Sequence, residues 1–580
     1  MPRYVVVAEK KSVAEAIYRV LKKYSQEEVA VTSVSGHLMD CDLVERYARW
    51  RLSDLLELFR PENTRLVVSD KYAYSRVTRA FSNLREGLMV VATDNDHEGE
   101  LIGYELLTVY RNIRGDLAEF RRMRFNSLEE DEIIRAWQNL ENDLNWGWVY
   151  KAQLRRTFDL IAGAAFTRLL TLSARRRVSS SRVISWGPVQ SPCLKFIVDR
   201  EKMIREFKPR KYWYVTCILK YGDAVFKASS GEVWDRALAK HLIQEASSAN
   251  LGEVLGYAEE RVRVARPLPA RTDDSLRELV KIMGRSSYSL MRVMEQLYQS
   301  GYLSYPRTET NRYPEGFDFK RRLKIVMGSG VLAGVELRGE SRPRNGRLSD
   351  GAHPPIYPTG AYTGGGVERA VWEYFARRFV ANAFTDDALV VRQSAVVKVG
   401  GVELKAVGRY LESAGFYTVF PYFKPREEPL PKLVVGAVVE VVEARLVEDE
   451  TKPPPRLSES DLLRMMESNE LGTDATRPLY PSLLIERGFI VREKRSLKPT
   501  VLGEALIETL KQVDERLVTP ETRRIVEGFM KSVEKGEIQL GVALSKALDI
   551  YRPLLQNCLA QIDRIGERLT MPLADGRQSS

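Results

Sequence analysis

The feature of this sequence that most constrains its fold is a β-rich segment that a long helical stretch interrupts. A strand, a turn at Gly222-Asp223 and a second strand are expected between Lys211 and Lys227. A second hairpin, centred on Gly400-Gly401, is expected between about Ser394 and Val407. The chain must therefore leave a β domain, build a helical unit and return, which predicts an arch that carries a cap at its far end.

The stretch between the two hairpins has the apolar spacing of helices. The apolar residues that recur at helical intervals are Leu279, Ile282, Met283, Leu290, Val293, Met294 and Leu297. Gly301 follows them as a stop signal. Loops rich in proline and charged residues, at 342–346, 424–429 and 451–455, mark further borders between structural units of the chain.

The N-terminal part of the chain alternates apolar strands with amphipathic helices, which predicts an α/β domain. Strands are expected at Val5–Ala8, Val29–Val34 and Leu88–Thr93, and a helix at Ser12–Lys23. A chain of 580 residues, at roughly 150 residues per domain, holds about four domains. We predict an α/β domain at 1–147, a helical domain at 148–208 with 452–580, a β arch at 209–264 with 388–451, and a helical cap at 265–387.

The composition is that of a folded protein. Apolar residues make up 44% of the chain and charged residues 29%, which excludes wholesale disorder. No stretch approaches the roughly 18 apolar residues of a membrane span, so we expect a soluble protein that stays inside the cell. The cysteines Cys41, Cys193, Cys217 and Cys558 lie far apart without a C-x-x-C pair, so any metal is expected to be held by oxygen atoms.

The net charge points to a polyanionic partner. Lysine and arginine number 89 against 78 aspartate and glutamate residues, a net charge of +11. Nucleic acid is the leading candidate for such a surface. The same balance occurs in proteins that touch no nucleic acid, so motifs must decide.

The carboxylates Asp94, Asp96 and Glu98 stand at alternate positions after an apolar strand, in the string Val90-Val91-Ala92-Thr93-Asp94-Asn95-Asp96-His97-Glu98-Gly99-Glu100. In an extended chain, alternation directs Asp94, Asp96 and Glu98 to one side, where their repulsion is costly unless a cation lies among them. Mg²⁺ fits best, because it takes carboxylate and water oxygens and commonly helps to hold phosphate. An isolated string of this kind is also typical of a solvated acidic loop.

A carboxylate and an ammonium group, Glu9 and Lys10, follow another buried strand of the same α/β unit. Sites in open α/β sheets form at the carboxyl ends of strands, so Glu9 is expected to meet the Asp94 cluster. A charged surface loop is the alternative interpretation of this pair. A glutamate after one strand and D-x-D-x-E after another resembles the TOPRIM domain of topoisomerases, primases and related nucleases.

A candidate nucleophile stands in the string Gly301-Tyr302-Leu303-Ser304-Tyr305-Pro306-Arg307-Thr308-Glu309-Thr310. A phenol is a poor nucleophile at neutral pH and needs a nearby cation, and Arg307 is two residues from Tyr305. Pro306 keeps Tyr305 out of the helical region of backbone space and presents it from an extended segment. A single tyrosine at a helix end more often packs on a core, but the whole string favours a nucleophile.

This string closely resembles the active-site tyrosine motif of type IA DNA topoisomerases, within them the topoisomerase III branch of archaea and eukaryotes. The resemblance runs from about Arg3 to Leu510 and implies a toroidal core of mixed α/β, β and α architecture: a TOPRIM Rossmann-like domain, a β arch and helical cap domains. The matching strings are Ala8-Glu9-Lys10, Ser35-Gly36-His37-Leu38, Asp94 to Glu100, Gly163-Ala164-Ala165-Phe166-Thr167-Arg168, Gly187-Pro188-Val189-Gln190-Ser191-Pro192, Tyr305 to Thr310, Ala352-His353-Pro354-Pro355-Ile356-Tyr357-Pro358-Thr359 and Gly472-Thr473-Asp474-Ala475-Thr476.

The resemblance implies an isomerase that cuts one DNA strand, passes another through the gap and reseals it without ATP. Tyr305 would attack and become joined to the 5′ phosphate. Glu9 would handle the proton of the departing 3′ hydroxyl, and Lys10 and Arg307 would stabilise the charge on the phosphate.

The resemblance also implies contacts to metal and DNA. His353 would lie beside the scissile phosphate, and Arg168 would anchor the strand to be cut. The predicted contacts to single-stranded DNA are Gln190, Ser191, Thr473 and Thr476, of which Gln190, Thr473 and Thr476 have the alternative of capping a helix or closing a turn. The Mg²⁺ ligands would be Asp94, Asp96 and Glu98, and the ion would chiefly serve religation.

Some positions depart from the family pattern. Lys11 stands where the branch usually has proline, and His97 where it usually has arginine. Many relatives carry C-terminal zinc modules built on four cysteines, whereas Cys558 is alone in that region. The C-terminal region around Cys558 is therefore expected to bind DNA without zinc, or to bind it only weakly.

Three other interpretations explain less. A TOPRIM nuclease or primase leaves the Tyr305 string unexplained, and a non-catalytic single-stranded DNA-binding protein explains only the charge. The topoisomerase half of a reverse gyrase would need a helicase portion, and the chain has no G-x-x-x-x-G-K-[ST] loop. The resemblance further implies a monomer that acts on single-stranded or underwound DNA, with a RecQ-family helicase or an OB-fold accessory protein as candidate partner and no membrane association. Its expected location is the cytoplasm at the nucleoid, or the nucleus in a eukaryote.

Overall fold

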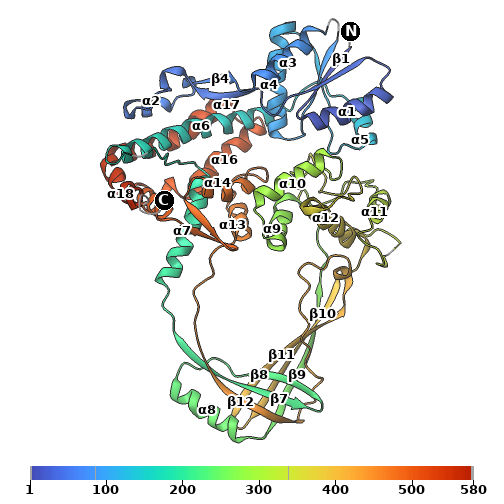
Figure 1. The fold of residues 1–580 in the computed structure, drawn as a ribbon, viewed down its shortest axis with the longest axis vertical. Helices are drawn as coiled ribbons and strands as arrows, with labels where there is room; N and C mark the ends of the chain where they lie inside the picture. Colours follow the sequence, from blue (N-terminus) through green and yellow to red (C-terminus); the bar gives the residue numbers. More distant parts are fainter. Residues whose placement is uncertain (1–2, 85–86, 180, 338, 576–580) are drawn as a thin grey trace.

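The chain closes into a ring (Figure 1). The computed structural model describes residues 3–84, 87–179, 181–337 and 339–575. An N-terminal α/β unit and a helical unit lie next to each other at one end of the ring, and a β barrel lies at the other end. The barrel is connected to the helical unit on one side and to a helical cap on the other. The predicted ring of α/β, β and helical parts is confirmed.

The N-terminal unit is built on a parallel sheet with strand order β2-β1-β5-β6. Its elements are β1 (Tyr4–Ala8), α1 (Lys11–Tyr24), β2 (Val29–Ser33), β3 (Met39–Leu43), α2 (Leu55–Leu58), β4 (Thr64–Val68), α3 (Lys71–Ser82), β5 (Leu88–Ala92), α4 (His97–Arg114), β6 (Phe120–Arg122) and α5 (Glu130–Gln138). β3 and β4 form a separate antiparallel pair.

Both faces of strand β1 are buried, which explains its continuous run of valines. Val5 and Val7 pack with residues of α3 and α4, whereas Val6 and Ala8 pack with residues of α1 and α5. A parallel strand covered by helices on both faces needs apolar residues at every position. The polar residues that follow such a strand therefore mark the place where the chain leaves the core.

The barrel is closed, with strand order β10-β11-β8-β7-β12-β9. Its elements are β7 (Lys211–Tyr221), β8 (Ala224–Ser229), α8 (Arg236–Ser248), β9 (Leu251–Val264), β10 (Ala388–Val399), β11 (Val402–Ser413) and β12 (Val438–Glu450). The two predicted hairpins are confirmed, and Gly222 and Gly400 take positive φ angles of 60° and 57° at their turns. Two distant segments of the chain thus share one sheet.

The cap lies between β9 and β10 in the sequence. Its helices are α9 (Thr272–Met283), α10 (Ser287–Gln299), α11 (Phe319–Gly328) and α12 (Gly366–Phe384). The predicted helical stretch is broken at Gly284, whose φ of 65° ends α9. Trp372 and Phe375 of α12 are fully buried in the core of the cap.

The helical unit joins two segments of the chain around a large apolar core that includes Phe158, Phe166 and Tyr551. Its elements are α6 (Trp146–Arg175), α7 (Gln190–Glu206), α13 (Glu459–Ser468), α14 (Tyr480–Glu486), β13 (Ile490–Glu493), β14 (Ser496–Pro499), α15 (Val501–Val513), α16 (Pro520–Glu534), α17 (Leu540–Ala560) and α18 (Ile562–Asp575). Across the described ranges, no helix combines the length and the apolar character needed to cross a membrane.

Candidate active site

Two neighbouring strands bring predicted site residues together. β1 and β5 pair in parallel with Ala8 opposite Ala92, so the residues that follow both strands lie at one edge of the sheet. Lys10 Nζ lies 3.4 Å from Oε1 of Glu9 and 3.6 Å from Oδ2 of Asp94. The ammonium group therefore lies between the two carboxylates.

The cluster carries more negative charge than its burial favours. Burial, together with the neighbouring Asp94 carboxylate, raises the pKa of Glu9 to about 8. Burial also raises the pKa of Asp94, which is 3% exposed, although Lys10 opposes this. A glutamic acid that keeps its proton near neutral pH is suited to protonate a leaving group.

Tyr305 comes to this edge from the cap. Its backbone N–H donates to the carbonyl oxygen of Asn126 at 2.8 Å, and its hydroxyl donates to Asp96 Oδ2 at 2.5 Å. Burial and the Asp96 carboxylate raise the pKa of Tyr305 well above its usual value. The phenol is therefore protonated, and a carboxylate lies in position to take its proton.

Arg307 lies close to the Asp96 carboxylate that accepts the Tyr305 hydroxyl. Its Nη1 lies 3.6 Å from Asp96 Oδ2, and its Nε donates to Glu295 Oε1 at 3.0 Å. Glu295, on α10, thus orients the guanidinium group. Glu295 was not predictable from the sequence, because no motif distinguishes it from other charged residues of a helix.

His353 stacks on the ring of Tyr305, with the ring centroids 5.0 Å apart and an angle of 25° between the rings. Its Nδ1 lies 3.0 Å from Asp350 Oδ2. Burial opposes protonation, but the bond to Asp350 raises the pKa of His353. Its side chain is 6% exposed, and within the described residues its Nε2 has no hydrogen-bond partner. This atom is suited to bind an anion.

The carboxylates after β5 do not form one group. α4 begins at His97, and Asp96 is its N-cap, accepting the N–H of Gly99 at 2.7 Å. Because the chain turns into a helix here, Glu98 lies in the first helical turn, with Oε2 at 3.1 Å from His37 Nε2. No group of three His, Cys, Asp or Glu side chains is placed to hold a metal ion in the part of the chain that is described. The alternation expected of an extended chain thus ends before Glu98.

A cavity of about 270 Å³ lies beside these residues. Asp96, Arg307 and His353 line it from the α/β unit and the cap. Thr473 and Thr476 line it from the helical unit, and the N–H of Thr473 donates to Oγ1 of Thr476 at 2.9 Å. The two threonines therefore close a turn and also border the cavity.

The other predicted DNA contacts lie elsewhere. Arg168 is 8% exposed and donates to the carbonyl oxygen of Tyr47 at 2.8 Å, and Gln190 donates to that of Ser185 at 3.0 Å. Ser191 is fully buried. None of the three predicted residues borders the cavity beside Tyr305.

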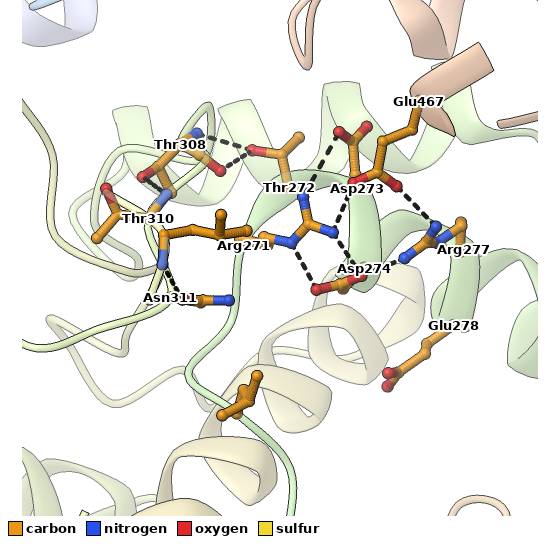
Figure 2. A network of polar contacts seen from close by, with 12 residues as sticks. Arg271, Thr272, Asp273, Asp274, Arg277, Glu278, Thr308, Thr310, Asn311 and Glu467 are labelled. Carbon is orange, nitrogen blue, oxygen red and sulfur yellow. Dashed lines mark hydrogen bonds and ion pairs between the residues drawn. The ribbon is translucent and has the colours of Figure 1, made fainter. Parts of the chain in front are cut away.

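The segment that carries Tyr305 is braced by the start of α9 (Figure 2). The hydroxyl of Thr272 donates to the carbonyl oxygens of Pro306 and Thr308, at 2.8 and 3.0 Å. The neighbouring Arg271 places Nη2 2.6 Å from Oε1 of Glu467 on α13. The tyrosine segment is thus linked through α9 to the helical unit.

Two family patterns together match nearly the whole chain. The Toprim domain matches residues 4–128, and the DNA topoisomerase family matches residues 143–543. The chain belongs to the type IA DNA topoisomerases. It is therefore an isomerase that acts on DNA, and Toprim domains generally bind Mg²⁺.

Named relatives cover most of the chain. DNA topoisomerase 1 of Thermoplasma acidophilum is 31% identical over 96% of this chain and 71% of its own length. DNA topoisomerase 3-beta-1 of Homo sapiens is 30% identical over 99% and 71%, and DNA topoisomerase 3 of Candidozyma auris is 30% identical over 95% and 93%. The structure of full-length topoisomerase I from Thermotoga maritima has the same fold, with a TM-score of 0.75 and 22% identity over 95% of this chain and 90% of that one.

Proposed function

We propose that Tyr305 is the nucleophile with which this topoisomerase cuts one DNA strand. Its hydroxyl oxygen attacks a backbone phosphorus while its proton passes to Asp96, which already accepts that hydrogen bond at 2.5 Å. The bond between phosphorus and the 3′ oxygen breaks, and the 5′ phosphate stays on Tyr305. The contact between Tyr305 and Asp96 carries this proposal.

Four further residues support the step. Glu9, whose pKa is about 8, gives its proton to the departing 3′ oxygen. Lys10, Arg307 and Nε2 of His353, which has no partner among the described residues, stabilise the negative charge on the phosphate. Resealing is the reverse of this step, and because one phosphodiester replaces another, no ATP is needed.

We propose that Asp94 and Asp96 hold Mg²⁺, with Glu98 as a third ligand once it leaves His37. The donor set fits, because these are hard oxygen ligands and burial raises the pKa of Asp94, which a cation would offset. When bound, the ion supplies positive charge beside the phosphate that is to be resealed. Titration with Mn²⁺ followed by electron paramagnetic resonance tests this. Binding should be lost when Asp94 and Asp96 are both changed to Asn, and unchanged binding would remove the site.

We propose that the substrate is single-stranded or underwound DNA, since the cavity beside Tyr305 receives one strand. Thr473 and Thr476 contact its backbone here. Arg168, Gln190 and Ser191 are buried in the closed ring, so a contact with DNA requires the helical unit to open there. Phosphate contacts on a single strand make log affinity fall linearly with log salt, by roughly 0.7 per phosphate. Tight binding to intact duplex that does not depend on salt would count against this substrate.

We propose that the ring works as four domains, with the barrel allowing the cap to separate from the rest. The boundaries are 1–147 for the Toprim domain, 148–208 with 452–580 for the helical domain, 209–264 with 388–451 for the barrel, and 265–387 for the cap. The cap carries Tyr305, so its separation after cleavage opens a gap through which a second strand passes.

We propose further that this is a topoisomerase III-like enzyme that relaxes negative supercoils and decatenates DNA. Relatives named DNA topoisomerase 3 support this branch, although others carry the name DNA topoisomerase 1. It acts as a monomer, with a RecQ-family helicase or an OB-fold protein as partner. It works at the nucleoid in the cytoplasm, or in the nucleus of a eukaryote.

Substitution of the phenol tests the proposal most simply. Tyr305→Phe should abolish the covalent adduct with a labelled single-stranded oligonucleotide and keep most of the binding, because only the hydroxyl is lost. Tyr302→Phe is the matched control, since this ring packs on Tyr362 in the cap. An adduct that survives Tyr305→Phe and disappears in Tyr302→Phe would show that the assignment is wrong.

A further inference from the structure

The cavity beside Tyr305 has a wall to which the proposed chemistry gives no role. Trp148, Lys151 and Arg155 line it from the first turns of α6. Their spacing of three and four residues places them along one face of the helix. An aromatic ring next to two cationic groups is the combination that proteins use for single-stranded nucleic acid.

Trp148 stands between two cavities. It borders both the cavity of about 270 Å³ beside Tyr305 and a neighbouring cavity of about 690 Å³. Its ring packs on that of His97 at 4.8 Å between centroids, and the side chain is only partly buried. It belongs to no hydrophobic cluster found among the described residues, whereas Trp146 packs against the core of the α/β unit. Its indole is therefore not explained as core packing.

Carboxylates orient the two cationic side chains beside the indole, and Arg155 keeps one nitrogen without a hydrogen bond among the described residues. Lys151 Nζ lies 2.7 Å from Glu534 Oε2 and 3.0 Å from His97 Nε2. Arg155 Nη2 lies 3.5 Å from Glu527 Oε2, and this nitrogen makes no hydrogen bond with any residue that the structure describes. A phosphate oxygen at this wall would complete the contacts of Arg155.

We propose that Trp148 is a stacking platform for the base of the nucleotide next to the scissile phosphate. Arg155 and Lys151 bind the phosphate on the far side of that nucleotide. The platform accepts any of the four bases, because each offers an aromatic face. This inference rests on the proposed function of Tyr305, since that residue defines which phosphate is scissile.

Combining a substitution of Trp148 with removal of one DNA base tests whether the indole stacks on that base. The affinity for a single-stranded oligonucleotide with one cleavage site is measured by fluorescence anisotropy in the Tyr305→Phe background, which does not cut. Trp148→Ala should weaken binding by roughly 5- to 150-fold, and Trp148→Phe should restore most of it. The oligonucleotide is then made with one base removed at each position around the cleavage site.

Stacking predicts a specific result. Removal of one base next to the cleavage site should weaken binding to the protein with Trp148 by the same factor, and should have almost no further effect on the Trp148→Ala protein. Trp146→Ala is the control, and its effect should be the same with and without that base. If Trp148→Ala acts equally on every oligonucleotide, or has no effect on any, the platform does not exist.

The outcomes separate this inference from the proposal on Tyr305. An adduct that forms in Tyr305→Phe contradicts the proposed nucleophile, whatever the base-removal series shows. Loss of the adduct in Tyr305→Phe, without coupling between Trp148 and any base, contradicts only the platform.

Discussion

Two of the seams along which the cap meets the rest of the molecule differ in character. At the catalytic seam, Tyr305 and Arg307 of the cap face Asp96 of the Toprim domain. At the α9–α13 seam, between helix α9 of the cap and helix α13 of the helical unit, Arg271 and Arg277 each contact an oxygen of Glu467, at 2.6 and 2.7 Å. On the proposed function, strand passage requires both seams to separate, because the cap carries the proposed nucleophile Tyr305.

The difference lies in how completely the charges are matched. The catalytic seam contains a glutamate with a pKa of about 8 and a histidine nitrogen that has no partner among the described residues. The α9–α13 seam instead pairs cations with carboxylates, as in the contacts of Arg271 and Arg277 with Glu467. On our proposal, a phosphate completes the first arrangement, whereas the second holds the cap in place. We therefore expect changes at one seam to alter cutting and changes at the other to alter opening.

The largest effect is expected from Glu9→Gln. Losing the acid that protonates the 3′ oxygen should slow formation of the covalent adduct by about 10²- to 10⁴-fold, with single-strand binding retained. Rapid-quench measurement of adduct formation gives the rate. Glu467→Gln, at the other seam, should leave this rate unchanged. Equal slowing by both substitutions would contradict the division between the seams.

The next effect concerns the apolar part of the α9–α13 seam. Leu463 belongs to α13 but packs in the core of the cap at 2% exposure. Leu463→Ala should weaken the closed seam by about 2–4 kcal/mol, seen as faster hydrogen exchange in α9. The neighbouring Leu462 packs in the core of the helical unit. Leu462→Ala should therefore lower the thermal stability of that unit instead, and the same response to both substitutions would refute this assignment.

A smaller effect is expected from the ion pairs of the same seam. Glu467→Gln removes one of the carboxylates that pair with Arg271 and Arg277, which both keep Asp274. The cost should be about 1–2 kcal/mol, because these side chains are partly exposed. Because the α9–α13 seam then opens more easily, the rate at which supercoiled DNA is relaxed should rise. Glu470→Gln is the control, because Glu470 pairs with Lys531 at the surface. It should change the closed state by less than about 0.5 kcal/mol.

The same seam should also depend on pH. Burial, although Arg477 opposes it, raises the pKa of Asp273 to about 7 in the closed seam. When the seam opens, water should return this pKa toward its ordinary value of about 3.9. The closed seam then binds more protons, so its stability should fall as pH rises from about 4 to 7 and level off above that. Spin-label distances between cap and helical unit at pH 5.5 and 7.5 measure this, and Asp273→Asn should remove the Asp273 contribution.

Much of the site was predictable from the ends of strands. Glu9 and Asp94 were expected to meet because both follow buried strands of one parallel sheet, and the structure places Lys10 between them. Glu98 was not predictable in the same way. Whether alternation continues depends on where the helix begins, and the N-cap at Asp96 ends it.

Other features needed the fold itself. Glu295 orients Arg307 from the preceding helix, through a contact that no motif marks. The break at Gly284 divides one apolar repeat into two helices, because a left-handed residue there ends α9. Spacing along the chain predicts which residues share a face, whereas contacts between distant segments depend on how the ring closes.

The polarity and position of the covalent bond test the central claim most directly. The wild-type protein is trapped with an oligonucleotide labelled at its 3′ end and, separately, at its 5′ end, and the adduct is mapped by mass spectrometry after proteolysis. The account predicts that the 3′-end label remains on the peptide that contains Tyr305, and that the 5′-labelled fragment leaves with a free 3′ hydroxyl. A bond to another residue, or retention of the 5′-end label, would contradict it.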